Sequence, residues 1–142
     1  MPVELVENAT QELTDALEKL IPQLSSSASK LSPEEVTRLI SQPSLRMFIY
    51  RGESGEIEGM LSLVLFHIPT GLRAWIEDVV VLEQTRGQGA GRQLVEAALE
   101  FATDAGARSV DLTSRPSREA ANRLYQRCGF ETRRTNVYRY RA

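Results

Sequence analysis

The chain of 142 residues has the hydrophobic content (42%) and the charged content (25%) of an ordinary globular protein. This length is enough for one substantial core, so we expect a single domain over residues 1–142. The net charge of −2 offers no general attraction to nucleic acid or to an anionic membrane, and neither partner is expected.

The N-terminal segment and the cysteine count favour a cytoplasmic protein. The first residues, MPVELVENATQ, become polar within four positions, so the sequence predicts no signal peptide. The longest apolar run, near residues 60–66, is too short to span a bilayer. Cys128 is the single cysteine, so an intramolecular disulfide is impossible and a reducing compartment is expected. Because His67 is the single histidine, we expect no dedicated metal site.

Two helices are predicted in the first third of the chain. Apolar residues recur at helical spacing over residues 6–21, which predicts a helix that ends at Pro22. A second, short helix is predicted over residues 33–40. It begins with a capping box, in which Ser32 is the cap and Glu35 the reciprocal partner.

Three strands follow the helices. Residues 46–50 and 58–66 flank a glycine-containing turn and predict an antiparallel hairpin. Residues 74–82 are apolar on both faces apart from Glu77 and Asp78, which is typical of a strand in the middle of a sheet.

The second half of the chain alternates helices and strands. Helical spacing over residues 94–105 is followed by a strand at residues 108–114 and a helix at residues 117–128. Two last strands are predicted at residues 130–134 and 136–141. The resulting order, ααβββαβαββ, predicts an α/β domain with a mixed sheet.

The stretch QTRGQGAGRQL, residues 84–94, joins the central strand to a helix and contains three glycines within five residues. The first N–H groups of a helix have no intrahelical partner, and the helix dipole adds about half a positive charge there. Glycines let such N–H groups approach a pyrophosphate without a Cβ in the way. On these residues alone, a phosphate site and a tight structural turn both remain open.

The spacing of the glycines excludes two well-known phosphate loops. A P-loop ends in Gly-Lys-Ser/Thr, whereas here Gly91 is followed by Arg92 and Gln93. The dinucleotide fingerprint G-x-G-x-x-G has its third glycine one residue later than this sequence does. That fingerprint also follows the first strand of a βαβ unit, whereas an antiparallel hairpin is predicted here.

Three stretches together resemble the GNAT superfamily of N-acetyltransferases. QTRGQG fits the acetyl-CoA motif Gln/Arg-x-x-Gly-x-Gly/Ala, WIEDVVV is similar to the family's fourth strand, and NRLYQRCGFE to its second motif. The resemblance covers roughly residues 46–134. It implies a mixed, mostly antiparallel central sheet flanked by helices. It also implies direct transfer of an acetyl group from acetyl-CoA to a primary amine, with no metal.

The resemblance also implies which residues contact acetyl-CoA. The main chain of three strand residues would pair with the pantetheine arm, namely Val79, Val80 and Val81. The backbone around the glycines would hold the pyrophosphate, through Arg86, Gly87, Gln88, Gly89, Ala90, Gly91 and Arg92. The family often has an asparagine seven residues before the motif's tyrosine. Here that position is Arg118, and Asn122 lies three before it, so the corresponding contact is left open.

Two residues are candidates for proton transfer. Tyr125 is a phenol that is protonated at neutral pH and is the candidate general acid for the departing CoA thiolate, the alternative being a tyrosine that only packs in the core. Glu77 is the candidate general base for the amine, with a pKa raised by burial in the sheet, the alternative being a carboxylate paired with an arginine. In a regular strand, Asp78 would point to the opposite face.

The acceptor amine is not specified by these motifs. The pattern is similar to the branch of the family that acetylates glucosamine 6-phosphate, and the late arginines could bind a sugar phosphate. Other small-molecule amines and peptide or protein amines remain open, as does a non-catalytic module that binds or senses acetyl-CoA. A homodimer through the first helix and residues 136–142 is also an open expectation.

Overall fold

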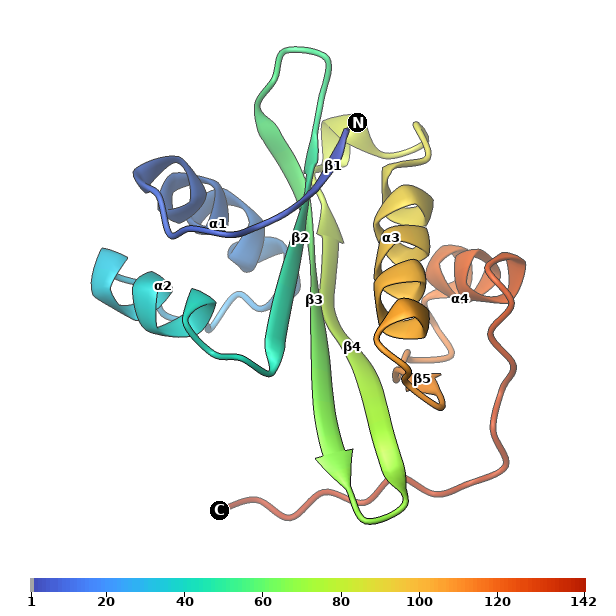
Figure 1. Ribbon diagram of the computed structural model, residues 1–142. Helices are drawn as coiled ribbons and strands as arrows, with labels where there is room; N and C mark the ends of the chain where they lie inside the picture. Colours follow the sequence, from blue (N-terminus) through green and yellow to red (C-terminus); the bar gives the residue numbers. More distant parts are fainter. Residues whose placement is uncertain (1) are drawn as a thin grey trace.

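The computed structural model describes residues 2–142, which form one five-stranded sheet with helices on both faces (Figure 1). The strands lie in chain order and comprise β1 (Val3–Leu5), β2 (Leu45–Arg51), β3 (Ile57–Ile68), β4 (Gly71–Val81) and β5 (Val110–Asp111). Neighbouring strands are antiparallel except β4 and β5, which are parallel. The predicted mixed, mostly antiparallel sheet is therefore confirmed.

Two helices cover each face of the sheet. Helices α1 (Gln11–Leu24) and α2 (Pro33–Ile40) lie on one side, and α3 (Ala90–Asp104) and α4 (Glu119–Arg127) lie on the other (Figure 1). A short 3-10 turn, η1 (Glu83–Thr85), joins β4 to the glycine-rich stretch. Among residues 2–142, none of the helices has both the length and the apolar character that a membrane crossing requires.

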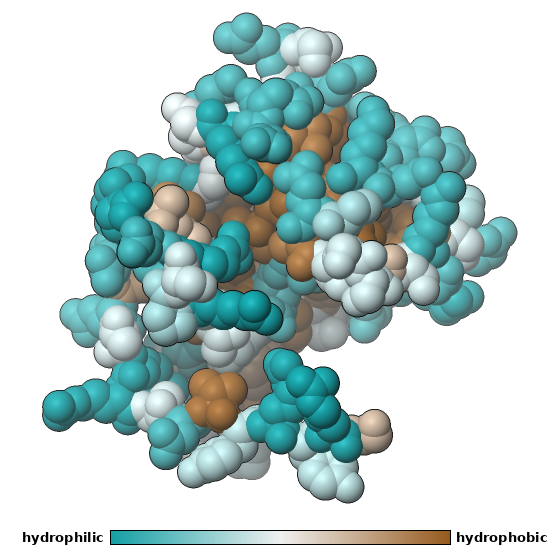
Figure 2. Space-filling model, turned by 180° about the vertical axis from the view of Figure 1, so that it is seen from behind, coloured by the Kyte–Doolittle hydropathy of each residue, from teal (hydrophilic) through white to brown (hydrophobic). Residues whose placement is uncertain are grey.

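The sheet separates two hydrophobic cores. On the α1/α2 side the buried side chains include Leu13, Leu17, Leu20, Val36, Met47 and Met60. On the α3/α4 side they include Phe48, Leu61, Leu63, Leu94, Val95 and Tyr125. Each buried aliphatic side chain contributes about 1.5–3 kcal/mol relative to full exposure, so both layers are held firmly against the sheet. Seen from behind, hydrophobic surface also gathers in a hollow of the molecule that is rimmed by hydrophilic residues (Figure 2).

The first helix differs from its prediction at both ends. It begins at Gln11 rather than at residue 6, because the Thr10 side chain accepts a hydrogen bond from the Leu13 N–H (3.1 Å) and caps the helix there. It also continues through Pro22 to Leu24. Pro22 lies in the last turn, where its missing N–H removes only one helical bond.

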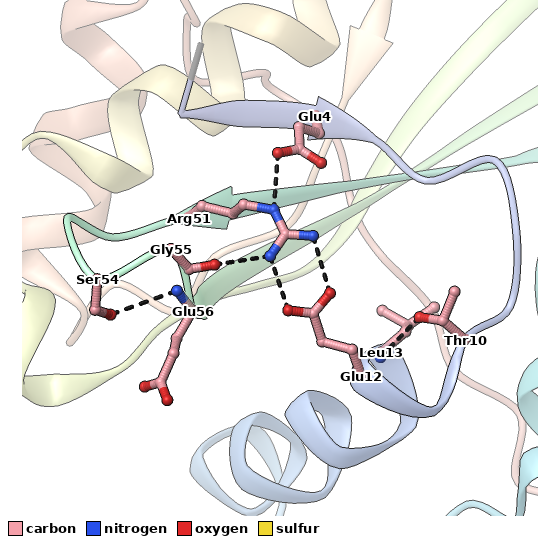
Figure 3. Close-up of polar contacts among 8 residues, drawn as sticks. All are labelled: Glu4, Thr10, Glu12, Leu13, Arg51, Ser54, Gly55 and Glu56. Atoms are coloured by element: carbon pink, nitrogen blue, oxygen red, sulfur yellow. Dashed lines mark hydrogen bonds and ion pairs between the residues drawn. The ribbon is translucent and has the colours of Figure 1, made fainter.

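A cluster around Arg51 fastens the N-terminal segment to the sheet (Figure 3). Its Nε lies 2.8 Å from a carboxylate oxygen of Glu4 on β1, and its two terminal nitrogens lie 2.8 and 3.0 Å from the carboxylate of Glu12 on α1. It also donates to the Gly55 carbonyl in the β2–β3 turn (2.8 Å). The hydrogen bond from Arg51 lowers the pKa of Glu12. Arg51 therefore ties the start of α1 to β1 and to the hairpin.

The two strands predicted at residues 130–134 and 136–141 are absent, and β5 is shorter than the predicted strand at residues 108–114. Residues 131–142 are exposed throughout, with Tyr138 88% and Tyr140 92% exposed. A strand is stable only when its backbone groups pair with a neighbour. Strand β5 has only two residues and offers few backbone groups for pairing. The strand-forming residues of the tail therefore do not form a strand beside it.

Candidate active site

Strand β4 contains a bulge next to its two carboxylates. Val80 pairs with Met60 of β3 and Glu77 pairs with Ser62, so two residues of β4 stand where β3 has one. Asp78 occupies this bulge with φ of 51°, and it is the one non-glycine residue of positive φ within residues 2–142. Left-handed backbone is uncommon outside glycine, asparagine and aspartate, so a short polar residue suits this position.

The bulge reverses which side chains of β4 face each core. Ile76 packs in the core under α3, whereas Val80 packs in the core under α1 and α2. In a regular strand these two side chains would share one face. The prediction that Asp78 points away from Glu77 assumed a regular strand, and β4 is not regular here; both residues line both of the cavities described next.

Two cavities meet at Glu77 and Asp78. The smaller has a volume of about 170 Å³, and its other lining residues include Ile76, Val79, Leu112, Thr113, Arg118 and Tyr125. The larger has a volume of about 330 Å³ between the sheet and helices α1 and α2, and its lining residues include Leu17, Ile21, Leu39, Met47, Met60 and Ser62. A ligand in one cavity would thus adjoin a ligand in the other at the two shared carboxylates.

Tyr125 projects from α4 to the smaller cavity and is only 8% exposed. Its ring packs edge-to-face against Phe130, with a centroid distance of 5.9 Å. Burial raises the pKa of Tyr125, and the positive charge of Arg118 partly opposes that effect. The phenol is therefore protonated at neutral pH and can donate a proton within the cavity.

Glu77 lies at the junction of the cavities but is exposed, so the predicted burial of this carboxylate is wrong. The cause is the position of Glu77 beside the bulge, where the two cavities admit solvent. Glu77 takes part in no ion pair within residues 2–142, and the alternative of an arginine partner is not observed. Ser62, its pairing partner on β3, also lines the larger cavity and was missed from the sequence. It could have been found as the one polar residue in the apolar run MLSLVLF.

Strands β4 and β5 separate beyond Trp75. Strand β5 pairs only with Ala74 and Trp75, whereas β4 continues to Val81. The edge of Val79–Val81 that faces away from β3 therefore has no strand partner among the described residues. Its backbone N–H and C=O groups can pair with an extended, amide-containing ligand. This is the separation that the family resemblance implied and that the sequence could not show.

The glycine-rich stretch presents a row of free backbone donors. The six N–H groups from Gly87 to Arg92 donate to no other group of residues 2–142, and the first helical bond is that of Gln93 to the Gly89 carbonyl (3.0 Å). Gly87 and Gly89 have φ of 85° and 80°, conformations that favour glycine. Free N–H groups at the start of a helix of this length form a site for an anionic group.

Gly91 and Arg92 also contact side chains of the protein itself. A Cβ on Gly91 would lie 3.2 Å from the Leu124 side chain, so this glycine permits the close approach of α4 to α3. The Arg92 Nε lies 3.0 Å from a carboxylate oxygen of Glu96 on the next turn of α3. Arg86 is exposed at the start of the stretch.

Arg118 and Asn122, the two candidates for the family's asparagine contact, have different surroundings in the structure. The Asn122 side chain donates to the carbonyls of Arg115 and Arg118, each at 2.9 Å, and so braces the loop before α4. Arg118 lines the smaller cavity together with Tyr125. Of the two, Arg118 is therefore the one whose side chain reaches the site.

A splayed β4 edge, a helix N-terminus rich in free N–H groups and a tyrosine-lined cavity are the features that an N-acetyltransferase of the family resembled by the sequence would need. The family model described as the acetyltransferase (GNAT) family matches residues 11–130, and the chain belongs to this family. It is therefore an N-acetyltransferase, an enzyme that transfers an acetyl group to an amine, as predicted.

Individual relatives act on different amines. The chain is 34% identical to the aminoalkylphosphonate N-acetyltransferase of Salmonella typhimurium, over 92% of this chain and 87% of the relative. It is 29% identical to an aminoglycoside N(6')-acetyltransferase of Stenotrophomonas maltophilia, over 74% and 72%. The solved glucosamine-6-phosphate N-acetyltransferase of Arabidopsis thaliana superposes with a TM-score of 0.80 over 99% of both chains at 20% identity, which shows the shared fold. None of these relatives supports the alternative of a non-catalytic module.

Proposed function

We propose that the protein transfers the acetyl group of acetyl-CoA directly to the primary amine of a small molecule, in the cytoplasm. The observation that carries this proposal is that two cavities on either side of β4 share Glu77 and Asp78. A donor in the smaller cavity and an acceptor in the larger one would therefore meet at one point. Direct transfer requires such a meeting, because both reactants must be bound together.

The donor would be held by backbone groups. The free N–H groups from Gly87 to Arg92 would bind the pyrophosphate of CoA, and the unpaired edge of Val79–Val81 would pair with the amides of the pantetheine arm. Acetyl-CoA supplies an acetyl group already activated as a thioester. The pantetheine direction along β4 leads from the glycine-rich stretch toward Tyr125, where the smaller cavity lies.

Two side chains would move the protons. Glu77 would accept a proton from the ammonium of the acceptor, directly or through a water molecule, so that the free amine can form the new C–N bond. Tyr125 would donate its phenolic proton to the sulfur as the C–S bond breaks. The nitrogen would lose its second excess proton to water as the amide forms, and water would then restore the proton on Tyr125. Burial raises the pKa of Tyr125, and the positive charge of Arg118 partly opposes that effect and would favour this transient phenolate.

The first test measures the release of free thiol from acetyl-CoA with a panel of primary amines, together with thermal stability in acetyl-CoA and in ATP. A ligand at one hundred times its Kd stabilises the fold by about 2.7 kcal/mol, and we expect this effect with acetyl-CoA alone. Stabilisation by acetyl-CoA without thiol release from any amine would contradict the proposed transfer.

The second test concerns the base. Glu77→Gln should lower kcat by about 10²-fold or more, because the amide accepts no proton. Asp78→Asn is the matched control at the same junction and should lower kcat less than Glu77→Gln does. A Glu77→Gln enzyme that keeps wild-type kcat would show that another group accepts the proton.

A further inference from the structure

We propose that the acceptor is a primary amine on an apolar body, such as an arylalkylamine or a linear alkylamine. This rests on the proposed function, since it concerns the acceptor side of the same site. The larger cavity would enclose the apolar body, and Glu77 and Asp78 would hold the ammonium at its end. Amines that carry a phosphate, a phosphonate or many hydroxyl groups would be poor acceptors.

The walls of the larger cavity are mainly hydrocarbon. Eight of its thirteen lining residues are aliphatic or methionine side chains, contributed by α1, α2 and strands β2 and β3 together with the loops beside them. Its volume of about 330 Å³ is at the lower end of the range of about 300–1,000 Å³ for small-molecule sites. Burial of apolar ligand surface against these walls is therefore the main source of affinity that the cavity offers.

The charges around the larger cavity favour a cation. Among residues 2–142, Glu77 and Asp78 are the only charged residues that line it, and no lysine, arginine or histidine of this range does so. An ammonium group next to two carboxylates is attracted, whereas a phosphate or phosphonate there would face like charge without a counter-ion. Arg118 lines the smaller cavity beside Tyr125, on the side proposed for the thioester, and does not line the larger one.

Hydrogen-bonding capacity in the larger cavity is also small. Besides the carboxylates, its polar side chains are Gln42, Ser44 and Ser62, and the Gln42 amide already donates to the Leu39 carbonyl (3.3 Å). A sugar ring would bring several hydroxyl groups against hydrocarbon, where each one without a partner opposes binding. An apolar body has no such groups to satisfy.

The cavity also fixes the direction in which such an amine would enter. Its carboxylates lie at the junction with the smaller cavity, and the apolar walls extend from there between the sheet and helices α1 and α2. An amine with its nitrogen at Glu77 and its body toward Leu17 and Leu39 would therefore present the nitrogen to the thioester. Affinity and reactivity would depend on the same orientation.

The experiment compares kcat/KM at saturating acetyl-CoA for five acceptors. These are 2-phenylethylamine, hexylamine, 2-aminoethylphosphonate, glucosamine 6-phosphate and kanamycin. We expect both apolar amines to exceed each of the others at least tenfold. An equal or greater value for any polar acceptor would overturn the inference and leave the proposed function intact. Absence of turnover with all five, despite stabilisation by acetyl-CoA, would overturn both.

A pair of variants tests the location of the site. Ser44 is exposed and lines the larger cavity, so Ser44→Arg brings a cation to it without disturbing the buried core. We expect kcat/KM for 2-phenylethylamine to fall at least tenfold through KM, that for 2-aminoethylphosphonate to rise, and KM for acetyl-CoA to stay unchanged. Ser26→Arg makes the same change at an exposed position that lines neither cavity. Identical kinetics of the two variants would overturn the assignment of the cavity.

Discussion

Replacing Tyr125 by phenylalanine removes one oxygen from the smaller cavity and tests the proposed acid. The ring is 8% exposed and packs edge-to-face on Phe130, a contact that phenylalanine retains. The hydroxyl makes no hydrogen bond to another group of residues 2–142. Because no protein hydrogen bond is lost, the free energy of unfolding should change by less than about 1 kcal/mol.

The effect on catalysis should be much larger than the effect on stability. Loss of a positioned general acid lowers a rate by about 10²–10⁴-fold, which is about 2.7–5.4 kcal/mol in the activation free energy. KM for acetyl-CoA should stay close to that of the wild type, because the variant leaves Gly87–Arg92 and the edge of Val79–Val81 unchanged. Since burial raises the pKa of Tyr125, wild-type kcat should decline at a higher pH than the ionisation of a free phenol would cause, and the variant should lack that decline.

The chain contains a matched control for this prediction. Tyr50 is also 8% exposed and belongs to the same hydrophobic core, but it lies on β2 and lines neither cavity. Tyr50→Phe should therefore retain wild-type kcat. Initial rates of thiol release and calorimetric Tm values, measured on both variants, separate catalysis from folding. Tyr125 is ruled out as the acid if Tyr125→Phe keeps kcat within about threefold of the wild type, or if both variants lose kcat equally.

Three further predictions concern packing, pH and assembly. Gly91→Val should destabilise the fold by about 1–3 kcal/mol in urea unfolding, since the Leu124 side chain stands 3.2 Å from the first added carbon; an unchanged midpoint would contradict the close packing. Arg51 lowers the pKa of Glu12 in the folded state, so this stabilisation is present at neutral pH and is lost as pH falls from about 4.3 through the lower folded pKa. Glu12→Gln should therefore lose less stability than the wild type between pH 7 and pH 3, and parallel losses would disprove the coupling. The homodimer stays a prediction: sedimentation should show a dimer that deletion of residues 136–142 converts to monomer, whereas an unaltered mass would remove the tail from the interface.

Elements that local chemistry specifies could be predicted closely. The capping box at Ser32 and Glu35 forms as expected, with the Ser32 N–H 3.0 Å from the Glu35 carboxylate and the Glu35 N–H 3.1 Å from the Ser32 hydroxyl. Helix α2 accordingly has the predicted bounds of residues 33–40. The first helix was predicted to begin at residue 6 because Val6 and Ala9 continue its apolar spacing, although both lie before the Thr10 cap and pack on the same core from outside the helix. Periodicity alone does not show where a helix begins.

The three glycines of the stretch at residues 84–94 have two different physical roles. Gly87 and Gly89 adopt left-handed backbone that glycine alone tolerates well, and both belong to the row of free N–H groups. Gly91 is helical, and the approach of Leu124 from α4 explains its lack of a side chain. Sequence spacing assigned all three glycines to one phosphate site. It could not reveal the packing role of Gly91, because the contact between α3 and α4 joins residues more than thirty positions apart.

The site depends on the β-bulge at Asp78, which could not be predicted from the sequence. A regular β4 would turn Glu77 and Asp78 to opposite faces, one carboxylate for each cavity. The bulge at Asp78 instead places both at the point where the cavities meet, and it moves Val80 into the core under α1 and α2 while Ile76 stays under α3. In the proposed function, this strand would present its unpaired edge to the donor and its carboxylates to the acceptor. The choice of acceptor would then depend on the hydrocarbon walls behind those carboxylates, which come largely from the N-terminal helices rather than from the motifs that identify the family.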